Sequence, residues 1–167
     1  MVDRRVVLAG GFAAMIFSLD WLRGGGDVKA ESAFEVTKTD AQWREFLTPA
    51  QFKVLRQHGT ERPGTSPLNR EKRKGTFACA GCDLPLFSSE TKFESGTGWP
   101  SFWQPLPDAI GTTTDNAFLM TRTEVHCRRC GGHLGHVFND GPKPTGLRYC
   151  MNGVALTFKP AVGAGPA

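Results

Sequence analysis

The sequence lacks a strong charge of either sign. It has 20 lysines and arginines against 16 aspartates and glutamates, so the formal net charge is only +4. Nucleic-acid-binding proteins are usually more basic and cluster their cations on one face, so we expect no nucleic-acid partner. The chain also shows no internal repeat and no heptad run, and we therefore expect a monomer.

The sequence also lacks an apolar run long enough to cross a membrane. Its longest run, Val6 to Leu19, covers roughly fourteen residues, whereas a membrane-spanning helix needs about twenty. Arg4-Arg5 precedes the run, and small residues ending at Ala30 follow it. We therefore expect residues 1–30 to be an export signal of twin-arginine type, leading to the bacterial periplasm and to no stable membrane association after cleavage. A retained anchor is the alternative, and a segment that is no working signal would leave the protein in the cytoplasm.

The rest of the composition is that of a small folded domain. Hydrophobic residues make up 40% and charged residues 22%, which allows a packed core. The 20 glycines and 11 prolines favour short strands and many turns over a helical bundle. We expect a linker at 31–38, a folded domain at 39–160 and a flexible tail at 161–167.

Local patterns predict two short helices followed by strands. Thr39 with Gln42 and Thr48 with Gln51 have the spacing of capping boxes, each opening a short helix. From residue 75 onward the hydrophobic period changes to two, which predicts strands at 76–79, 118–125 and 154–158. The expected fold class is mainly β, with short N-terminal helices.

Four of the five cysteines form two C-x-x-C pairs, Cys79 with Cys82 and Cys127 with Cys130. Two such pairs with glycines close by complete a tetrahedral four-sulfur site, for which Zn²⁺ is the natural ion. Because the protein would fill all four positions, the expected zinc is structural, one per chain. Two disulfides, a pair of zinc knuckles that bind nucleic acid, and iron in the same ligand set are the alternatives.

The fifth cysteine, Cys150, has chemically active neighbours. Arg148 and Asn152 each lie two residues away, so on a strand they share its face. Arg148 could stabilise a thiolate, and the Asn152 amide could orient a substrate. Upstream, His133 and His136 can donate a proton near neutral pH, and Asp140 adds a carboxylate.

A Gly-rich loop carries Trp99, which could either cap the core or form one wall of a pocket for a small apolar group such as a methyl.

Together these motifs resemble the methionine-R-sulfoxide reductase family, MsrB. The resemblance runs from about residue 39 to 159. It rests on the two C-x-x-C pairs, the Gly-Trp-Pro-Ser-Phe block at 98–102, the Gly-His-Leu-Gly-His-Val-Phe segment at 132–138 and Arg-Tyr-Cys-Met-Asn at 148–152.

This resemblance implies two small antiparallel sheets and reduction of the R epimer of methionine sulfoxide, free or in oxidised proteins and peptides. By the same resemblance Cys150 is the nucleophile, His133 and His136 assist proton transfer, and Trp99 and Phe138 hold the substrate methyl group. Arg148, Asp140 and Asn152 would form the supporting hydrogen-bond shell.

The chain departs from a common pattern of that family at Thr97, where many members carry a resolving cysteine. The other four cysteines are assigned to metal, so we expect a Cys150 sulfenic acid that a thioredoxin-like protein or another external thiol reduces directly. Two different functions stay open. A zinc-ribbon binding module would explain the four cysteines alone, and a cysteine hydrolase would use Cys150 with a histidine.

Overall fold

The computed structural model describes residues 34–116 and 121–162, and Ser32–Ala167 forms a compact unit of its own. The predicted export signal at 1–30 lies outside the described residues, as do positions 163–167 of the predicted tail. Within the described part, none of the helices has the length and apolar character that a membrane span requires.

The two predicted helices are present and begin where the capping boxes predict. Helix α1 (Asp40–Phe46) is capped by Thr39, and helix α2 (Pro49–Gln57) is capped by Thr48, each with a complete capping box. Helix α2 ends at His58, which takes a left-handed conformation with φ of 52°. The end of α2 therefore presents an imidazole to the larger sheet, where His58 contacts Glu124.

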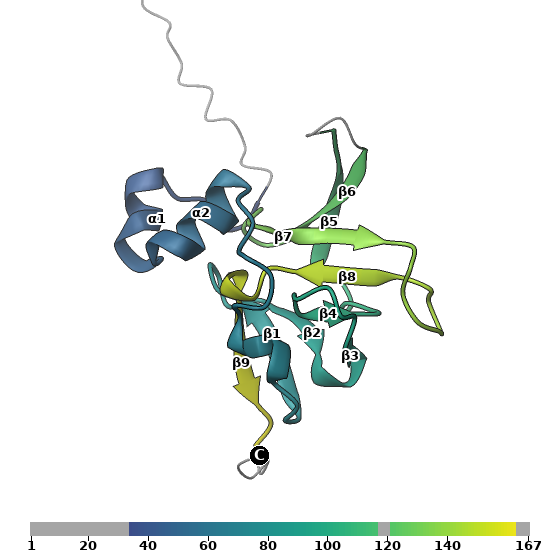
Figure 1. The fold of residues 1–167 in the computed structure, drawn as a ribbon. Coiled ribbons are helices and arrows are strands. Elements are labelled where there is room, and N and C mark those ends of the chain that lie inside the picture. The colour runs from purple at the N-terminus through teal and green to yellow at the C-terminus, as the bar shows by residue number, and fades with distance from the viewer. Residues whose placement is uncertain (1–33, 117–120, 163–167) are drawn as a thin grey trace, which may run out of the picture. The chain divides into compact units, whose positions relative to one another are not determined.

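Two antiparallel sheets follow the helices, as predicted (Figure 1). The smaller has the order β2-β1-β9 and the larger the order β3-β4-β8-β7-β6-β5. The strands are β1 (Gly75–Cys79), β2 (Pro85–Ser88), β3 (Lys92–Phe93), β4 (Ser101–Phe102), β5 (Ile110–Asp115), β6 (Arg122–Cys127), β7 (His133–Phe138), β8 (Arg148–Met151) and β9 (Leu156–Pro160). Short 3-10 turns lie at η1 (Pro67–Arg70), η2 (Ser89–Thr91) and η4 (Gly153–Ala155).

One predicted strand needs correction at its start, and another is described only in part. The strand predicted at 154–158 begins only at Leu156, because Gly153, Val154 and Ala155 form the η4 turn. The Glu61 carboxylate accepts the backbone N–H groups of Gly153 and Val154, so these donors are taken away from a sheet ladder. The strand predicted at 118–125 corresponds to β6 from Arg122 onward, and its first positions lie outside the described residues.

The core lies between the two sheets and the helix pair. Phe77 and Phe87 of the smaller sheet pack on Phe102 of the larger one, with ring centroids 4.9 and 4.4 Å apart, and all three are fully buried. Helix α2 contacts β7 and the η4 turn, which places the helix pair beside the larger sheet (Figure 1). The η4 turn follows closely after β8, and β8 carries Cys150.

Residues 34–38, predicted as a linker, are tied to the end of β6 and the turn after it. The Val36 N–H donates to the Arg129 carbonyl at 3.0 Å, and the Phe34 ring meets His126 edge to face. Arg128 pairs with Glu35 at 2.6 Å.

Candidate functional site

The register of the larger sheet brings the predicted site residues into one row. Ser101 on β4 lies opposite Cys150 on β8, and Cys150 lies opposite His136 on β7. His136 in turn lies opposite Glu124 on β6, which lies opposite Thr113 on β5. Directly opposed residues of antiparallel strands point to the same face, so five strands present polar groups side by side.

A pocket of about 120 Å³ opens over this row. Its wall contains the predicted residues Cys150, His136, Asn152, Trp99 and Phe138. Thr60, Arg122 and Gly135 complete it. The wall combines two aromatic rings with one thiol. His133, Arg148 and Asp140 are not on the wall.

Arg148 does not line the pocket but packs on Phe138, which does. Its guanidinium makes two parallel hydrogen bonds of 2.8 Å to the Asp140 carboxylate and lies 4.4 Å from the centre of the Phe138 ring. The hydrogen bond to Asp140 raises the pKa of Arg148, with a smaller contribution from attraction to Cys150. Arg148 therefore places a permanent positive charge near the Cys150 sulfur.

His136 is oriented by a carboxylate that the sequence patterns did not reveal. Its Nε2 lies 2.8 Å from Oδ2 of Asp115, and Arg122 donates to the same oxygen at 2.7 Å. Because a carboxylate only accepts, Nε2 carries a hydrogen and the ring is held in one orientation. Asp115 therefore orients His136, which lies opposite Cys150 in the sheet.

His133 lies deeper than His136, against which its ring packs edge to face with centroids 5.4 Å apart. A register irregularity between β6 and β7 brings these two side chains together. His133 Nδ1 donates to Glu124 at 2.7 Å, and its Nε2 is buried with no hydrogen-bond partner among the described residues. Burial lowers the pKa of His133, and the bond to Glu124 opposes this without cancelling it. His133 is therefore a neutral support of His136.

Glu124 is the centre of this support. It accepts from His133, from the exposed His58 at 3.0 Å and from the Thr113 hydroxyl at 2.8 Å. Burial disfavours the carboxylate, but the hydrogen bonds from His133 and Thr113 outweigh it, and the pKa of Glu124 lies below its ordinary value. The donor atoms of His58, Glu124 and His133 lie within 4.8 Å of one another.

Asn152 lines the pocket, yet its amide is already engaged. Its Nδ2 donates to the Leu134 carbonyl at 3.0 Å, and its Oδ1 accepts the Glu61 N–H at 2.9 Å. The Glu61 carbonyl also accepts the Trp99 indole N–H at 3.2 Å. Glu61 thus holds both Trp99 and Asn152 in place at the pocket.

Sequence reasoning missed Glu61, Asp115, Arg122 and Thr60. Each lies on a segment with no motif of its own, far along the chain from Cys150. The only local signal for these residues was an alternation along one strand, formed by Arg122, Glu124 and His126. It places an arginine and a carboxylate on the same face of the sheet.

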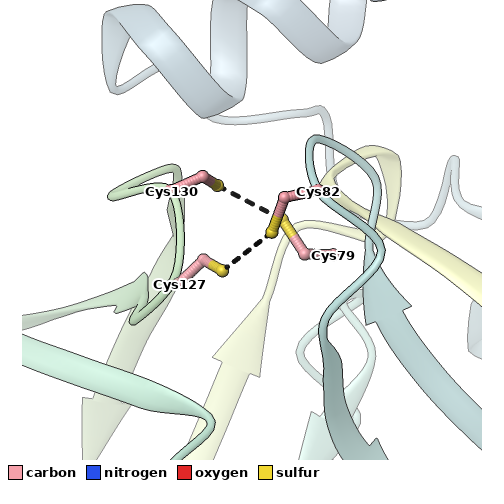
Figure 2. A group of neighbouring side chains, drawn as sticks. All are labelled: Cys79, Cys82, Cys127 and Cys130. Carbon is pink, nitrogen blue, oxygen red and sulfur yellow. Dashed lines mark hydrogen bonds between the residues drawn. The ribbon is translucent and has the colours of Figure 1, made fainter. Parts of the chain in front are cut away.

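The four cysteines of the C-x-x-C pairs come together at a second location, from the turn after β1 and the turn after β6 (Figure 2). The Cys79 and Cys130 sulfurs are 3.7 Å apart, and the Cys82 and Cys127 sulfurs 3.4 Å apart. A tetrahedral Zn²⁺ ion with bonds of about 2.3 Å would separate its sulfur ligands by about 3.8 Å. The arrangement therefore fits a four-coordinate metal ion with little adjustment.

The electrostatics of the four-cysteine cluster also favour a cation bound among the sulfurs. Hydrogen bonds from the other three thiols lower the pKa of Cys127, whereas hydrogen bonding and burial raise the pKa of Cys79. Four crowded sulfurs cannot all ionise unless a positive charge lies among them. All five cysteines are free thiols, so the disulfide alternative finds no support in this geometry.

Fold and site together define a class. This is a mainly β thiol oxidoreductase in which a cluster of four cysteines that could hold a metal ion lies apart from a lone cysteine in a pocket with a histidine opposite. The SelR domain family matches residues 47–160.

Three relatives carry the name peptide methionine sulfoxide reductase MsrB. That of Agrobacterium fabrum is 56% identical over 127 residues, covering 75% of this chain and 94% of the relative. That of Pseudomonas putida is 57% identical over 131 residues, covering 78% and 98%. That of Leptospira interrogans is 54% identical over 127 residues, covering 75% and 97%. The chain belongs to the MsrB family of peptide methionine sulfoxide reductases.

Proposed function

We propose that this protein reduces methionine-R-sulfoxide in oxidised proteins or peptides to methionine. The observation that carries the proposal is the position of Cys150 in a pocket wall shared with Trp99, Phe138 and His136. Methionine sulfoxide has an apolar methyl group beside a polar oxygen. The aromatic rings suit the methyl group, and the histidine suits the oxygen.

The reaction begins with attack of the Cys150 thiolate on the sulfoxide sulfur. His136, held by Asp115, supplies the proton that the sulfoxide oxygen takes up as the S–O bond weakens. The oxygen passes to Cys150, methionine leaves, and Cys150 becomes a sulfenic acid. The substrate sulfur gains the two electrons that the Cys150 sulfur loses, so the step balances.

The return step needs a thiol from outside the chain. Cys150 is the fifth and last cysteine, and the other four lie together in the metal cluster. A thioredoxin-like dithiol protein, or another thiol, attacks the sulfenic acid, releases water and leaves Cys150 reduced.

The four-cysteine cluster holds one structural zinc ion in this proposal. Cys79, Cys82, Cys127 and Cys130 would be its ligands, and the ion would supply only cross-linking of two turns, since no coordination position stays open. Metal analysis of the purified protein should give about one zinc per chain with no visible absorption, because a four-sulfur iron site would be coloured.

The decisive assay measures dithiothreitol-dependent reduction of both epimers of a methionine sulfoxide peptide. We expect activity on the R epimer only, abolished by Cys150→Ser. Turnover without thiol consumption, or activity that survives the substitution, would reject the proposal.

A second experiment treats the enzyme with substrate and no reductant, then traps the oxidised cysteine. Wild type should yield a sulfenic acid on Cys150. The matched control is Thr97→Cys, which places a thiol where the Thr97 hydroxyl lies 3.7 Å from the Cys150 sulfur and should yield an intramolecular disulfide instead. A disulfide in the wild-type chain would contradict the one-cysteine cycle.

We also propose that residues 1–30 direct export to the periplasm and that the mature protein is a monomer. The support is the sequence pattern alone. Fractionation of cells that express the full chain should place it in the periplasm, and Arg4→Lys with Arg5→Lys should retain it inside. Size-exclusion chromatography with light scattering should give the monomer mass.

A further inference from the structure

A chain of three hydroxyl groups leads away from Cys150. The Thr97 hydroxyl lies 3.7 Å from the Cys150 sulfur and 2.8 Å from the Ser95 hydroxyl. Ser95 lies 2.7 Å from the Ser101 hydroxyl, and Ser101 donates to the Trp99 carbonyl at 3.1 Å. None of these groups is accounted for by the reaction steps above.

Counting hydrogens fixes the direction of every bond in the chain. A carbonyl only accepts, so the single hydrogen of Ser101 is spent on Trp99. Ser95 must then donate to Ser101, and for the same reason Thr97 must donate to Ser95. The Thr97 oxygen is left as an acceptor toward Cys150, which suits a protonated thiol because an S–H group can donate.

A thiolate reverses the last link. It has no hydrogen and needs donors, and the Thr97 hydroxyl can turn from Ser95 to the sulfur. Ser95 then loses that donor, but its oxygen still accepts the Thr97 backbone N–H, which lies 3.4 Å away. Both protonation states of Cys150 thus find a satisfied set of partners in the same backbone geometry.

We propose that Thr97 is a two-way hydrogen-bond partner of Cys150, accepting from the thiol and donating to the thiolate. Ser95 competes for the Thr97 hydrogen, because the donation to Ser95 must be given up when the thiolate forms. Ser101, fully buried and directly opposite Cys150 in the sheet, anchors the chain. The position where a resolving cysteine is absent therefore has a positioning role of its own.

The proposal gives Thr97 and Ser95 opposite effects, which a merely structural role would not. Removing the Thr97 hydroxyl takes a donor from the thiolate and should make ionisation of Cys150 harder. Removing the Ser95 hydroxyl leaves Thr97 free to donate to sulfur and should make ionisation easier. The charged groups around Cys150 are unchanged in both variants: Arg148 on β8, His136 on β7, Arg122 on β6 and Asp115 on β5.

The test measures the rate of iodoacetamide alkylation of Cys150 against pH in the metal-loaded protein, with residue 150 followed by mass spectrometry. For Thr97→Val we expect the midpoint to rise by about one pH unit, the size of one hydrogen bond to a charged group. Thr97→Ser should restore the wild-type midpoint, and Ser95→Ala should lower it. The matched control is Thr114→Val, an exposed threonine of β5, which should change nothing.

An unchanged midpoint in Thr97→Val, or a shift of Ser95→Ala in the same direction as Thr97→Val, would overturn the proposal. If Thr97→Val fails to fold, the direction of the Ser95→Ala shift decides alone. The inference rests on Cys150 as the reactive thiol of the proposed function, but alkylation needs no sulfoxide. Failure of the hydroxyl chain is therefore distinguishable from failure of the reductase activity, which the Cys150→Ser assay reports.

Discussion

Glu61 offers the sharpest test of how the pocket is held, since it connects three parts of the site. Its carboxylate accepts the N–H groups of Gly153 at 2.6 Å and Val154 at 3.0 Å. Its own N–H and carbonyl hold Asn152 and Trp99. The perturbation is a pair of substitutions, Glu61→Ala and Glu61→Gln, which leave the backbone contacts in place and change only the carboxylate.

The magnitude follows from the two donors that the carboxylate satisfies. A hydrogen bond to a charged group contributes about 1.5–3 kcal/mol, and Gly153 is buried, so its N–H has no water to replace the lost acceptor. Glu61→Ala should therefore cost about 3 kcal/mol of unfolding free energy. Glu61→Gln keeps one acceptor oxygen but turns an NH₂ group toward the other N–H, and should cost roughly half as much.

Urea unfolding checks both values. With a slope of about 2 kcal/mol per molar urea, the midpoint should fall by about 1.5 M for Glu61→Ala, with the slope unchanged. Glu45→Gln, which alters an exposed carboxylate of α1, is the control and should leave the midpoint within the error. Reductase assays on the same variants should show a raised KM, because the η4 turn that directly follows Asn152 of the pocket wall loses its anchor. If Glu61→Ala cost less than about 0.5 kcal/mol, the turn would be held by something other than this carboxylate.

Three further predictions use the same measurements. Cys79→Ser should remove the metal from the four-cysteine cluster and lower the unfolding free energy by at least about 3 kcal/mol, checked by metal content and urea unfolding. Asp140→Asn should cost under about 1 kcal/mol at pH 7, because the Asp140 side chain is 64% exposed and solvent screens its pairing with Arg148. The hydrogen bond from Arg148 lowers the pKa of Asp140, so this contribution is present above pH about 4 and lost as the pH falls further, and the difference between variant and wild type in urea should shrink accordingly. Gly153→Ser should cost about 2 kcal/mol, since a Cβ there would meet the Ser66 hydroxyl at 1.9 Å, and Ser66→Gly should recover at least half of that in a double-mutant cycle.

Features that depend on neighbours in the sequence were predictable. Both helices begin at capping boxes that can be read directly, since the cap and its partner are three residues apart. The gathering of the four cysteines was predictable because a C-x-x-C spacing already brings two sulfurs together, and two such pairs imply one site. The export signal, the monomeric state and the identity of the metal stay predictions.

Features that depend on long-range pairing were not predictable. Asp115 orients His136 from 21 positions away, and Glu61 holds Asn152 from 91 positions away. No local pattern marks a carboxylate whose partner is chosen by strand order. The same reason explains the η4 turn. The hydrophobic alternation predicted a strand there, but the distant Glu61 carboxylate accepts the backbone N–H groups of Gly153 and Val154.

The row from Ser101 through Cys150, His136 and Glu124 to Thr113 shows how much of the chemistry depends on register alone. A slip of one residue between β7 and β8 would turn Cys150 to the opposite face from His136 and separate the thiol from its acid–base group. Gly135 protects this register, because a Cβ there would lie 2.1 Å from the Cys150 carbonyl oxygen, so only a residue without a side chain lets β8 come this close. The neighbouring pairs Val137 with Tyr149 and Phe138 with Arg148 keep the strands aligned on either side. The row is thus a consequence of how the six strands of the larger sheet are aligned, and the hydroxyl chain joins it at Ser101 on β4.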